Sequence, residues 1–188
     1  VSGVGVRAIA LPDDVRDGRA FARLQVRTRL VPQEAGVLHL APANRQLANL
    51  EQELLGEPGW EKALSDAISP VADRYRFILI DCPPSLGLLT LNALTAADAV
   101  LIPLQSEYYA LEGLANLVET VDLVRSQLNP KLEIQGIVLT MADQRNNLAR
   151  QVEAEVRGHF GDKVYRTRIP RNVRLSEAPS HGQPILLY

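Results

Sequence analysis

Phe77-Ile78-Leu79-Ile80-Asp81-Cys82-Pro83-Pro84 is the stretch that decides the fold. Its four apolar residues run without alternation, which is typical of a strand buried on both faces in a parallel sheet covered by helices. Because proline has no amide hydrogen to donate, the two prolines should end the strand and turn the chain. Ligands of open α/β sheets bind beyond the carboxyl ends of the strands. Asp81 is therefore a candidate to hold a hydrated Mg²⁺ beside a nucleotide phosphate, and the alternative is an Asp that caps the next helix.

Strand and helix patterns alternate on both sides of this stretch from residue 37 onward. Parallel strands need crossover connections, which helices supply. We therefore predict one α/β domain over residues 1–188, with a mostly parallel sheet flanked by helices. The expected strands are 37–40, 76–81, 99–104, 134–139 and 164–169; the expected helices are 45–56, 58–73, 86–97, 107–128 and 147–160, with a loop from 170 to the end.

The composition is that of an ordinary soluble protein. The 188 residues are 46% hydrophobic and carry 20 basic and 22 acidic side chains, so the net charge indicates no partner. Cys82 is the single cysteine, which excludes an intrachain disulfide and fits a reducing cytosol. No apolar run approaches the ~20 residues of a membrane span. The first residue is Val1 rather than Met, so we expect the sequence to begin part-way through a gene product.

Basic residues gather in one part of this nearly neutral chain. Arginine clusters that meet phosphates bind nucleic acid in a salt-sensitive, sequence-independent way. The alternative is a set of scattered, solvated arginines. Between residues 145 and 174, eight basic residues (Arg145, Arg150, Arg157, Lys163, Arg166, Arg168, Arg171, Arg174) stand against three acids (Glu153, Glu155, Asp162).

Four ordered blocks of the sequence resemble the ParA/Soj family of chromosome- and plasmid-partitioning ATPases, which have a deviant phosphate loop. Asp81 to Gly87, continued by 91–94, is similar to the family's Walker B and switch II region. The other blocks are 107–113, 139–152 and the most distinctive one, 169–182. The resemblance spans about residues 37–188 and, more loosely, 2–7, and it implies a P-loop NTPase-like fold.

One part of the family pattern is missing. The family has a phosphate loop of the form Lys-Gly-Gly-x-Gly-Lys-Thr-Thr near its N-terminus, followed by Asp-x-Asp-Pro-Gln, and neither occurs here. The segment 3–5 lacks the lysine and hydroxyl that a phosphate loop needs. We therefore expect an N-terminally truncated domain, and ATP hydrolysis by this chain stays open. The alternatives to a ParA-type ATPase are a non-hydrolysing DNA- or protein-binding remnant and a MinD-like division-site ATPase.

The resemblance implies ATP and Mg²⁺ as cofactors and assigns roles to individual residues. Asp81 would be the catalytic Walker B acid that holds Mg²⁺ through water, and Pro84 and Gly87 would belong to the switch that senses the γ-phosphate. Met141, Pro170 and Asn172 would line the adenine base of the nucleotide. For Pro170 and Asn172 the alternative is a plain turn without a ligand.

The resemblance also implies partners. Arg145 and Arg174 match family positions that bind DNA without sequence specificity, and Arg171 and Arg150 are candidate helpers. ATP would drive formation of a homodimer on nucleoid DNA, and a ParB-like protein would stimulate hydrolysis. A cytoplasmic, nucleoid-associated protein without a membrane partner is expected.

Overall fold

The computed structural model describes residues 27–28, 39–40, 56–82, 85–107, 109–143 and 145–188. The chain falls into two compact units. The first unit contains Leu101–Val118 and Ile134–Tyr188, and the second contains Glu119–Glu133 together with the described residues up to Val100. The single domain predicted over 1–188 stays a prediction.

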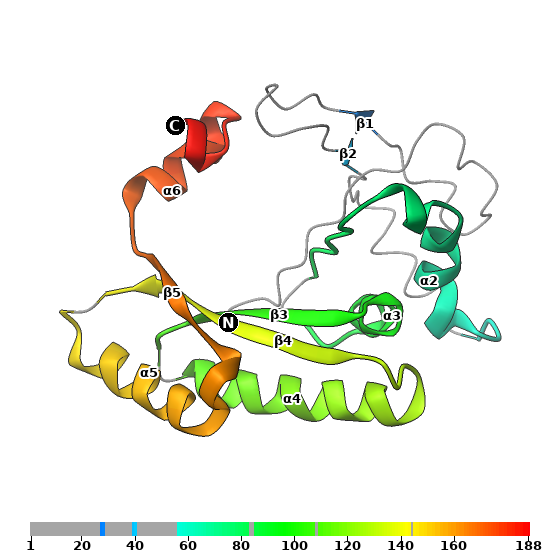
Figure 1. The fold of residues 1–188 in the computed structure, drawn as a ribbon, viewed down its shortest axis with the longest axis horizontal. Coiled ribbons are helices and arrows are strands. Elements are labelled where there is room, and N and C mark those ends of the chain that lie inside the picture. Colours follow the sequence, from blue (N-terminus) through cyan, green and yellow to red (C-terminus); the bar gives the residue numbers. More distant parts are fainter. Residues whose placement is uncertain (1–26, 29–38, 41–55, 83–84, 108, 144) are drawn as a thin grey trace. The chain divides into compact units, whose positions relative to one another are not determined.

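A three-stranded parallel sheet organises the first unit (Figure 1). Its strands are β3 (Ala99–Gln105), β4 (Glu133–Ala142) and β5 (Val164–Pro170), in the order β3-β4-β5. Helix α4 (Tyr109–Gln127) connects β3 to β4, and helix α5 (Asn147–Phe160) connects β4 to β5. These helices are the crossovers that parallel pairing requires, so the predicted sheet flanked by helices is confirmed.

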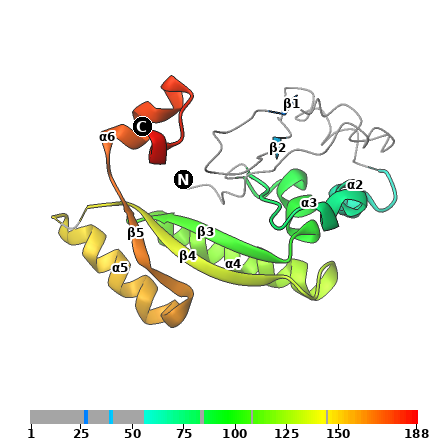
Figure 2. The same ribbon diagram turned by 45° about the horizontal axis from the view of Figure 1, so that its top comes forward.

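Apolar side chains hold α5 against the sheet. Ala149, Val152 and Val156 recur at helical spacing on one face of α5, and all three are buried. Ile137 and Leu139 of β4 are completely buried as well. Each fully buried aliphatic side chain of this size contributes about 1.5–3 kcal/mol to folding. Figure 2 shows α5 beside β4 and β5.

Helix α5 has clear signals at both ends. The Asn146 side-chain oxygen accepts a hydrogen bond from the Leu148 amide at 2.9 Å, which satisfies one of the unpaired donors of the first turn. At the other end, Gly161 has a φ of 52°, a conformation that residues with a Cβ rarely adopt. These signals explain why α5 begins and ends where the helix at 147–160 was predicted.

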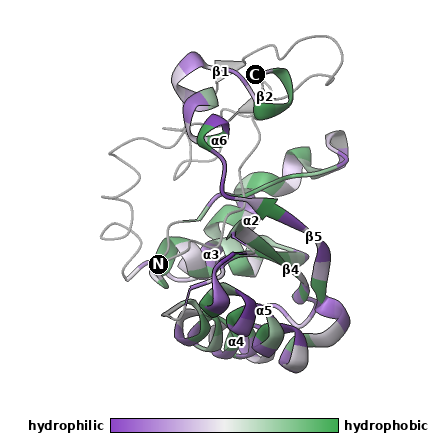
Figure 3. Cartoon of the chain, turned by 90° about the vertical axis from the view of Figure 1, so that its left-hand side faces the viewer, coloured by the Kyte–Doolittle hydropathy of each residue, from purple (hydrophilic) through white to green (hydrophobic). Residues whose placement is uncertain are grey.

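Strand β5 is exposed along most of its length. Of its residues only Val164 is buried, and Figure 3 shows hydrophilic colouring along parts of the strand. The pairing of β4 with β5 is irregular: Ile137 lies opposite Val164 and Leu139 opposite Arg168, with a register shift between them.

Gly136 permits the close approach of β4 and β5. A Cβ at this position would lie 2.6 Å from Cε2 of Tyr165 and 2.9 Å from the Lys163 carbonyl oxygen. We expect Gly136→Ala to destabilise the fold by about 1–3 kcal/mol, because the backbone carbonyl cannot move aside cheaply. The shift in the midpoint of urea unfolding measures this. Gly158→Ala on α5, where a Cβ meets nothing within 4 Å, is the control and should stabilise by up to about 1 kcal/mol. Equal midpoints for the two variants would contradict this explanation of Gly136.

In the second unit, two asparagines connect the backbones of different elements. Asn92 of α3 (Leu88–Ala96) is buried; its oxygen accepts from the Leu64 amide at 3.2 Å, in α2 (Ala63–Ile68), and its nitrogen donates to the Leu88 carbonyl at 3.3 Å. The Asn129 side-chain nitrogen donates to the carbonyls of Leu94, at 3.1 Å, and Ala97, at 2.7 Å. It thereby satisfies carbonyl groups at the end of α3 that have no partner within the helix.

Most predicted elements from residue 86 onward are confirmed, but the predicted strand at 76–81 and the loop predicted after residue 169 are wrong. The segment 76–81 forms no strand in the described part of the chain, and Phe77 and Leu79 are 66% and 47% exposed. A strand needs a neighbour for its backbone groups, and an apolar run cannot supply one. The loop expected after residue 169 instead contains the helix α6 (Val173–Glu177) and the short 3-10 turns η5 (Ala178–His181) and η6 (Ile185–Leu187).

The helix predicted at 58–73 is broken into three pieces. Its central part is α2, which lies between the 3-10 turns η2 (Trp60–Lys62) and η3 (Ser69–Arg74), with a proline in the first turn of η3. Of the strand predicted at 37–40, β2 (His39–Leu40) is described and pairs antiparallel with β1 (Arg27–Thr28). The helix predicted at 45–56 lies almost entirely outside the described residues. No helix in the described ranges is both long and apolar enough to span a bilayer.

Candidate functional site

A cavity of about 260 Å³ lies at the carboxyl ends of the three strands of the first unit. This is the edge at which open α/β sheets bind their ligands. The residues after β3, at the end of β4, after β5 and at the start of α5 form its wall. They are Ser106, Glu107, Met141, Asp143, Asn146, Ala149 and Arg171.

Met141 lies in this wall with an unusual backbone conformation. Its φ is 51°, in the left-handed region that residues with a Cβ seldom occupy. Such a conformation costs on the order of 1–3 kcal/mol, and residues of this kind gather at ligand sites. The side chain is partly exposed, so its thioether and methyl group offer an apolar surface to a ligand in the cavity.

Charged groups stand at the mouth of the cavity. The Asp143 carboxylate accepts hydrogen bonds from the Arg145 amide at 3.0 Å and from its Nε at 3.3 Å. These bonds, with the charges of Arg145 and Arg171, hold the pKa of Asp143 below its usual value. Nη2 of Arg171 lies 3.7 Å from Oε1 of Glu107, and both side chains are more than 60% exposed. Such a pair adds little to stability, so Arg171 can turn toward a ligand.

The residues predicted for the adenine side take different positions in the structure. Met141 lines the cavity, and Arg171, between Pro170 and Asn172, does so too, whereas Pro170 and Asn172 are not part of the wall. The Asn172 oxygen accepts from the Arg174 amide at 2.9 Å and caps α6. The turn predicted as the alternative role of Pro170 and Asn172 is therefore present. The side-chain NH₂ of Asn172 can still donate a hydrogen bond. The adenine role stays a prediction.

Asp81 is exposed in the second unit. Burial, followed by the negative charge of Asp81, raises the pKa of the neighbouring Cys82 thiol to about 11. Gly87 directly precedes α3, and its carbonyl accepts from the Leu91 amide at 3.0 Å. Pro84 lies outside the described residues. A shared pocket for Asp81 and Asn172 joins residues of both units and stays a prediction.

An exposed carboxylate fits the expected way of holding Mg²⁺. Magnesium usually keeps several waters and takes one or two carboxylates plus substrate phosphates, so a single Asp81 suffices on the protein side. In the described ranges no group of three or more His, Cys, Asp or Glu side chains could hold a metal by itself. Asp81 would therefore act together with the phosphates of a nucleotide.

The polar residues of the cavity wall were missed at the sequence level. Ser106 lies between the predicted strand 99–104 and the predicted helix 107–128, Glu107 begins that helix, and Asn146 directly precedes the predicted helix 147–160. The rule that places ligands beyond the carboxyl ends of strands could have indicated all of them. Polar residues after the carboxyl end of a strand were the signal, but only Asp81 was predicted from it.

The four arginines predicted to bind DNA all belong to the first unit. Arg145 is 92% exposed despite its contact with Asp143. Arg150 donates to the neutral side-chain oxygen of Asn147, so its charge is not compensated there. Arg174 is exposed, and no carboxylate in the described part of the chain pairs with it. The structure thus leaves these charges accessible, while binding to DNA stays a prediction.

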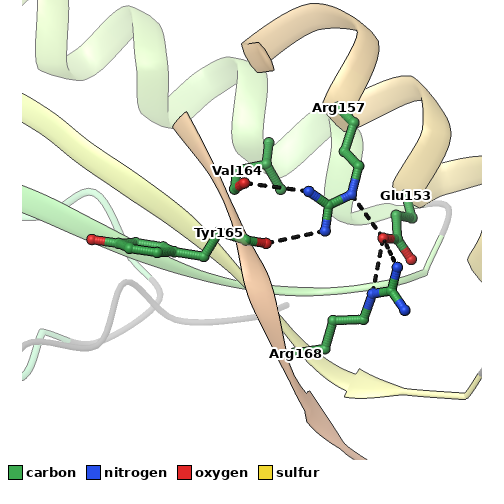
Figure 4. A network of polar contacts seen from close by, with 5 residues as sticks. All are labelled: Glu153, Arg157, Val164, Tyr165 and Arg168. Atoms are coloured by element: carbon green, nitrogen blue, oxygen red, sulfur yellow. Dashed lines mark hydrogen bonds and ion pairs between the residues drawn. The ribbon is translucent and has the colours of Figure 1, made fainter. Parts of the chain in front are cut away.

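Two other arginines of this region are not accessible in the same way. Nε of Arg157 lies 2.8 Å from Oε1 of Glu153, and Nη2 of Arg168 lies 2.6 Å from the same oxygen (Figure 4). Burial alone would raise the pKa of Glu153, but the hydrogen bonds from both arginines hold it below the usual value. Glu153 therefore stays charged at neutral pH and joins α5 to β5.

Comparison with known proteins identifies relatives over the whole chain. A family model described as an AAA domain matches residues 8–134. The chromosome partitioning protein ParA of Myxococcus xanthus is 51% identical over 187 residues, which is 100% of this chain and 66% of the relative. The sporulation initiation inhibitor protein Soj of Bacillus subtilis is 59% identical over 151 residues, 80% of this chain and 60% of the relative. The chain therefore spans less than two thirds of the length of these two relatives.

A solved structure agrees with these sequence matches. Cobyrinic acid a,c-diamide synthase from Mycobacterium smegmatis, with a bound ATP analogue and magnesium, superposes with a TM-score of 0.72 at 31% identity. The match covers 92% of this chain and 75% of the synthase. Together with the parallel sheet and the AAA-domain match, it places the chain in the class of P-loop NTPase-like α/β proteins. More narrowly, the chain belongs to the ParA/Soj family of chromosome-partitioning ATPases.

Proposed function

We propose that this chain is part of a ParA/Soj-type ATPase that moves or segregates a chromosome or plasmid. ATP with Mg²⁺ drives formation of a homodimer, and the dimer binds DNA without sequence specificity. A ParB-like partner stimulates hydrolysis and thereby release from DNA. The protein works in the cytoplasm on the nucleoid. The observation that carries the proposal is a cavity at the carboxyl edge of the sheet in a chain 51% identical to a ParA protein.

The chemistry of the wall supports a nucleotide base as the ligand in the cavity. Met141 and Ala149 offer apolar surface, Asn146 keeps its NH₂ as a donor because its oxygen caps α5, and Asp143 offers acceptor oxygens. An aminopurine ring has one apolar plane and an edge with both acceptors and donors. A base of this kind can therefore be held by packing and hydrogen bonds without a charge of its own.

Phosphoryl transfer depends mainly on positioning and charge stabilisation. Asp81 would hold Mg²⁺ through water, and the metal would supply charge neutralisation between the phosphates. Gly87, at the start of α3, lies where a change in the preceding turn alters the entry into the helix, as a phosphate-sensing switch requires. A protein that binds DNA but never turns over ATP is the competing proposal, because the phosphate-loop pattern does not occur in the sequence.

Asn172→Asp tests the adenine role separately from the cap. Asp is as good an N-cap as Asn, so the midpoint of thermal unfolding should stay within about 1 °C. The variant replaces a donor by an anionic acceptor, so the affinity of the full-length gene product for ATP should fall at least about tenfold, or 1.4 kcal/mol. Isothermal titration calorimetry with Mg²⁺-ATP measures the affinity.

Asn172→Ser is the matched control for this experiment. It keeps a capping oxygen but removes the amide without adding a charge, so its affinity should lie between those of the wild type and Asn172→Asp. Unchanged ATP affinity in both variants would remove Asn172 from the adenine side and leave it as a helix cap.

A further inference from the structure

The cationic side chains between residues 145 and 174 differ in what holds them. Arg157 and Arg168 both contact Oε1 of Glu153, at 2.8 Å and 2.6 Å (Figure 4). The Glu153 side chain is only 16% exposed, so water screens this contact less than a surface ion pair. The two guanidinium groups therefore share one carboxylate that is partly buried between α5 and β5.

Arg157 has a second set of partners, whereas Arg168 does not. Nη1 of Arg157 donates to the Val164 carbonyl at 3.3 Å, and Nη2 donates to the Tyr165 carbonyl at 3.0 Å. These two bonds would hold Arg157 against β5 even without Glu153. In the described part of the chain, the side-chain partner of Arg168 is Glu153 alone, through Nε at 2.9 Å and through Nη2. Glu153 is thus the residue that fixes the position of Arg168.

Arg166 shows what Arg168 would be without this partner. The two arginines lie two residues apart on β5. Arg166 is exposed, and within the described ranges no carboxylate pairs with it. The same strand therefore presents one guanidinium that is accessible to an anion and one that already contacts a carboxylate.

We propose that Glu153 keeps Arg168 from binding phosphate and so limits the number of cations that the first unit offers to a nucleic-acid backbone. The inference rests on the proposed DNA binding and adds a residue that sets its strength. A carboxylate bound to a guanidinium competes directly with phosphate, because both anions accept hydrogen bonds from the same N–H groups. An ion pair that is partly buried is also harder to exchange than an exposed one.

The salt dependence of DNA binding tests the proposal. We would measure the Kd of the full-length gene product with Mg²⁺-ATP for a duplex of random sequence between 50 and 200 mM KCl. Each phosphate contact adds about 0.9 to the slope of log Kd against log salt. Arg168→Gln should leave the slope unchanged, whereas Arg174→Gln should lower it by about 0.9. Glu153→Gln should raise it by about 0.9, and Glu153→Gln with Arg168→Gln should restore the wild-type slope.

Glu155→Gln is the matched control for the loss of negative charge. Glu155 lies two residues further along α5, is exposed, and pairs with no cation in the part of the chain that the structure describes. Its replacement removes the same charge without freeing an arginine, so the slope should stay at the wild-type value. Glu153→Gln keeps a neutral oxygen that both arginines can contact but removes the negative charge that competes with phosphate for Arg168. Circular dichroism checks that both variants fold.

The outcomes separate this inference from the function on which it rests. Two outcomes would overturn the inference. In the first, Arg168→Gln lowers the slope of log Kd against log salt as much as Arg174→Gln does. In the second, the slope of Glu153→Gln is no steeper than that of Glu155→Gln. If Glu153→Gln does not fold, Arg168→Gln decides alone. Wild-type protein with no salt-dependent binding to DNA overturns the proposed function instead.

Discussion

Replacement of Arg145 and Arg174 by glutamate should raise the Kd for non-specific DNA by about 100-fold. Both side chains are exposed, and Arg174 has no ion pair within the described ranges. Two lost attractions and two new repulsions of about 0.7 kcal/mol each amount to about 2.8 kcal/mol, or roughly 100-fold in Kd. A gel-shift titration of the full-length gene product at several salt concentrations measures the effect. The salt slope of the double variant should also fall by about 1.8, because two phosphate contacts are lost.

The control must change the net charge equally without touching this region. Arg76 and Lys131 are exposed residues of the second unit, and their joint replacement by glutamate gives the same charge change. If binding followed net charge alone, both double variants would lose it equally. Equal loss, or an unchanged gel shift of Arg145→Glu with Arg174→Glu, would contradict the assignment of a DNA surface to the first unit.

Replacement of Asp81 by alanine should reduce the Mg²⁺-dependent ATP turnover of the full-length gene product by about 100-fold or more. The loss of a metal-positioning group displaces the reacting phosphate, and a displacement of 1 Å can cost this much. Asp81 is exposed, so the midpoint of thermal unfolding should change little. The Asp81 charge also contributes to the raised pKa of Cys82, about 11. The pH dependence of thiol alkylation should therefore move to lower pH in the variant.

Asp98→Ala is the control for this prediction. Asp98 is an exposed aspartate of the same unit, directly before β3, and so at the amino end of a strand. Ligands of open sheets bind at the opposite edge, so turnover should be retained. Turnover that survives in Asp81→Ala, with an intact fold, would refute the metal role. The absence of turnover in the wild-type gene product would favour a protein that binds without hydrolysis.

Local periodicity was sufficient for β3, β4, β5, α4 and α5, but not for the helical segments after residue 172. Helix α5 was predicted at 147–160 because Leu148, Val152 and Val156 recur at helical spacing; the structure buries Val152 and Val156, whereas Leu148 is exposed and Ala149 is buried in its place. The strands β3 and β4 were predicted from apolar runs bounded by polar residues and turns. Most of the side chains that define these patterns are also buried in the structure.

The segment 76–81 is a case in which an apolar run predicted a strand that the structure does not form. Its apolar run has the composition of a buried strand, yet Phe77 and Leu79 are exposed and no strand forms there in the described residues. Burial is a property of two surfaces, and an apolar sequence specifies only one of them. The cavity residues Ser106, Glu107 and Asn146 were missed for a related reason, since only the meeting of several strand ends gathers them.

The sequence by itself determined that this protein has alternating strands and helices, a parallel sheet, and membership of the ParA/Soj family, because spacing and motif order are properties of the linear chain. The tertiary structure alone decided which arginines are held and which are accessible. Arg168 on β5 and Glu153 on α5 are 15 residues apart, and they meet only because the crossover helix packs back beside the strand that follows it. Eight basic residues look alike in a sequence, but the fold holds Arg157 and Arg168 on one partly buried carboxylate, whereas Arg166 and Arg174 stay exposed.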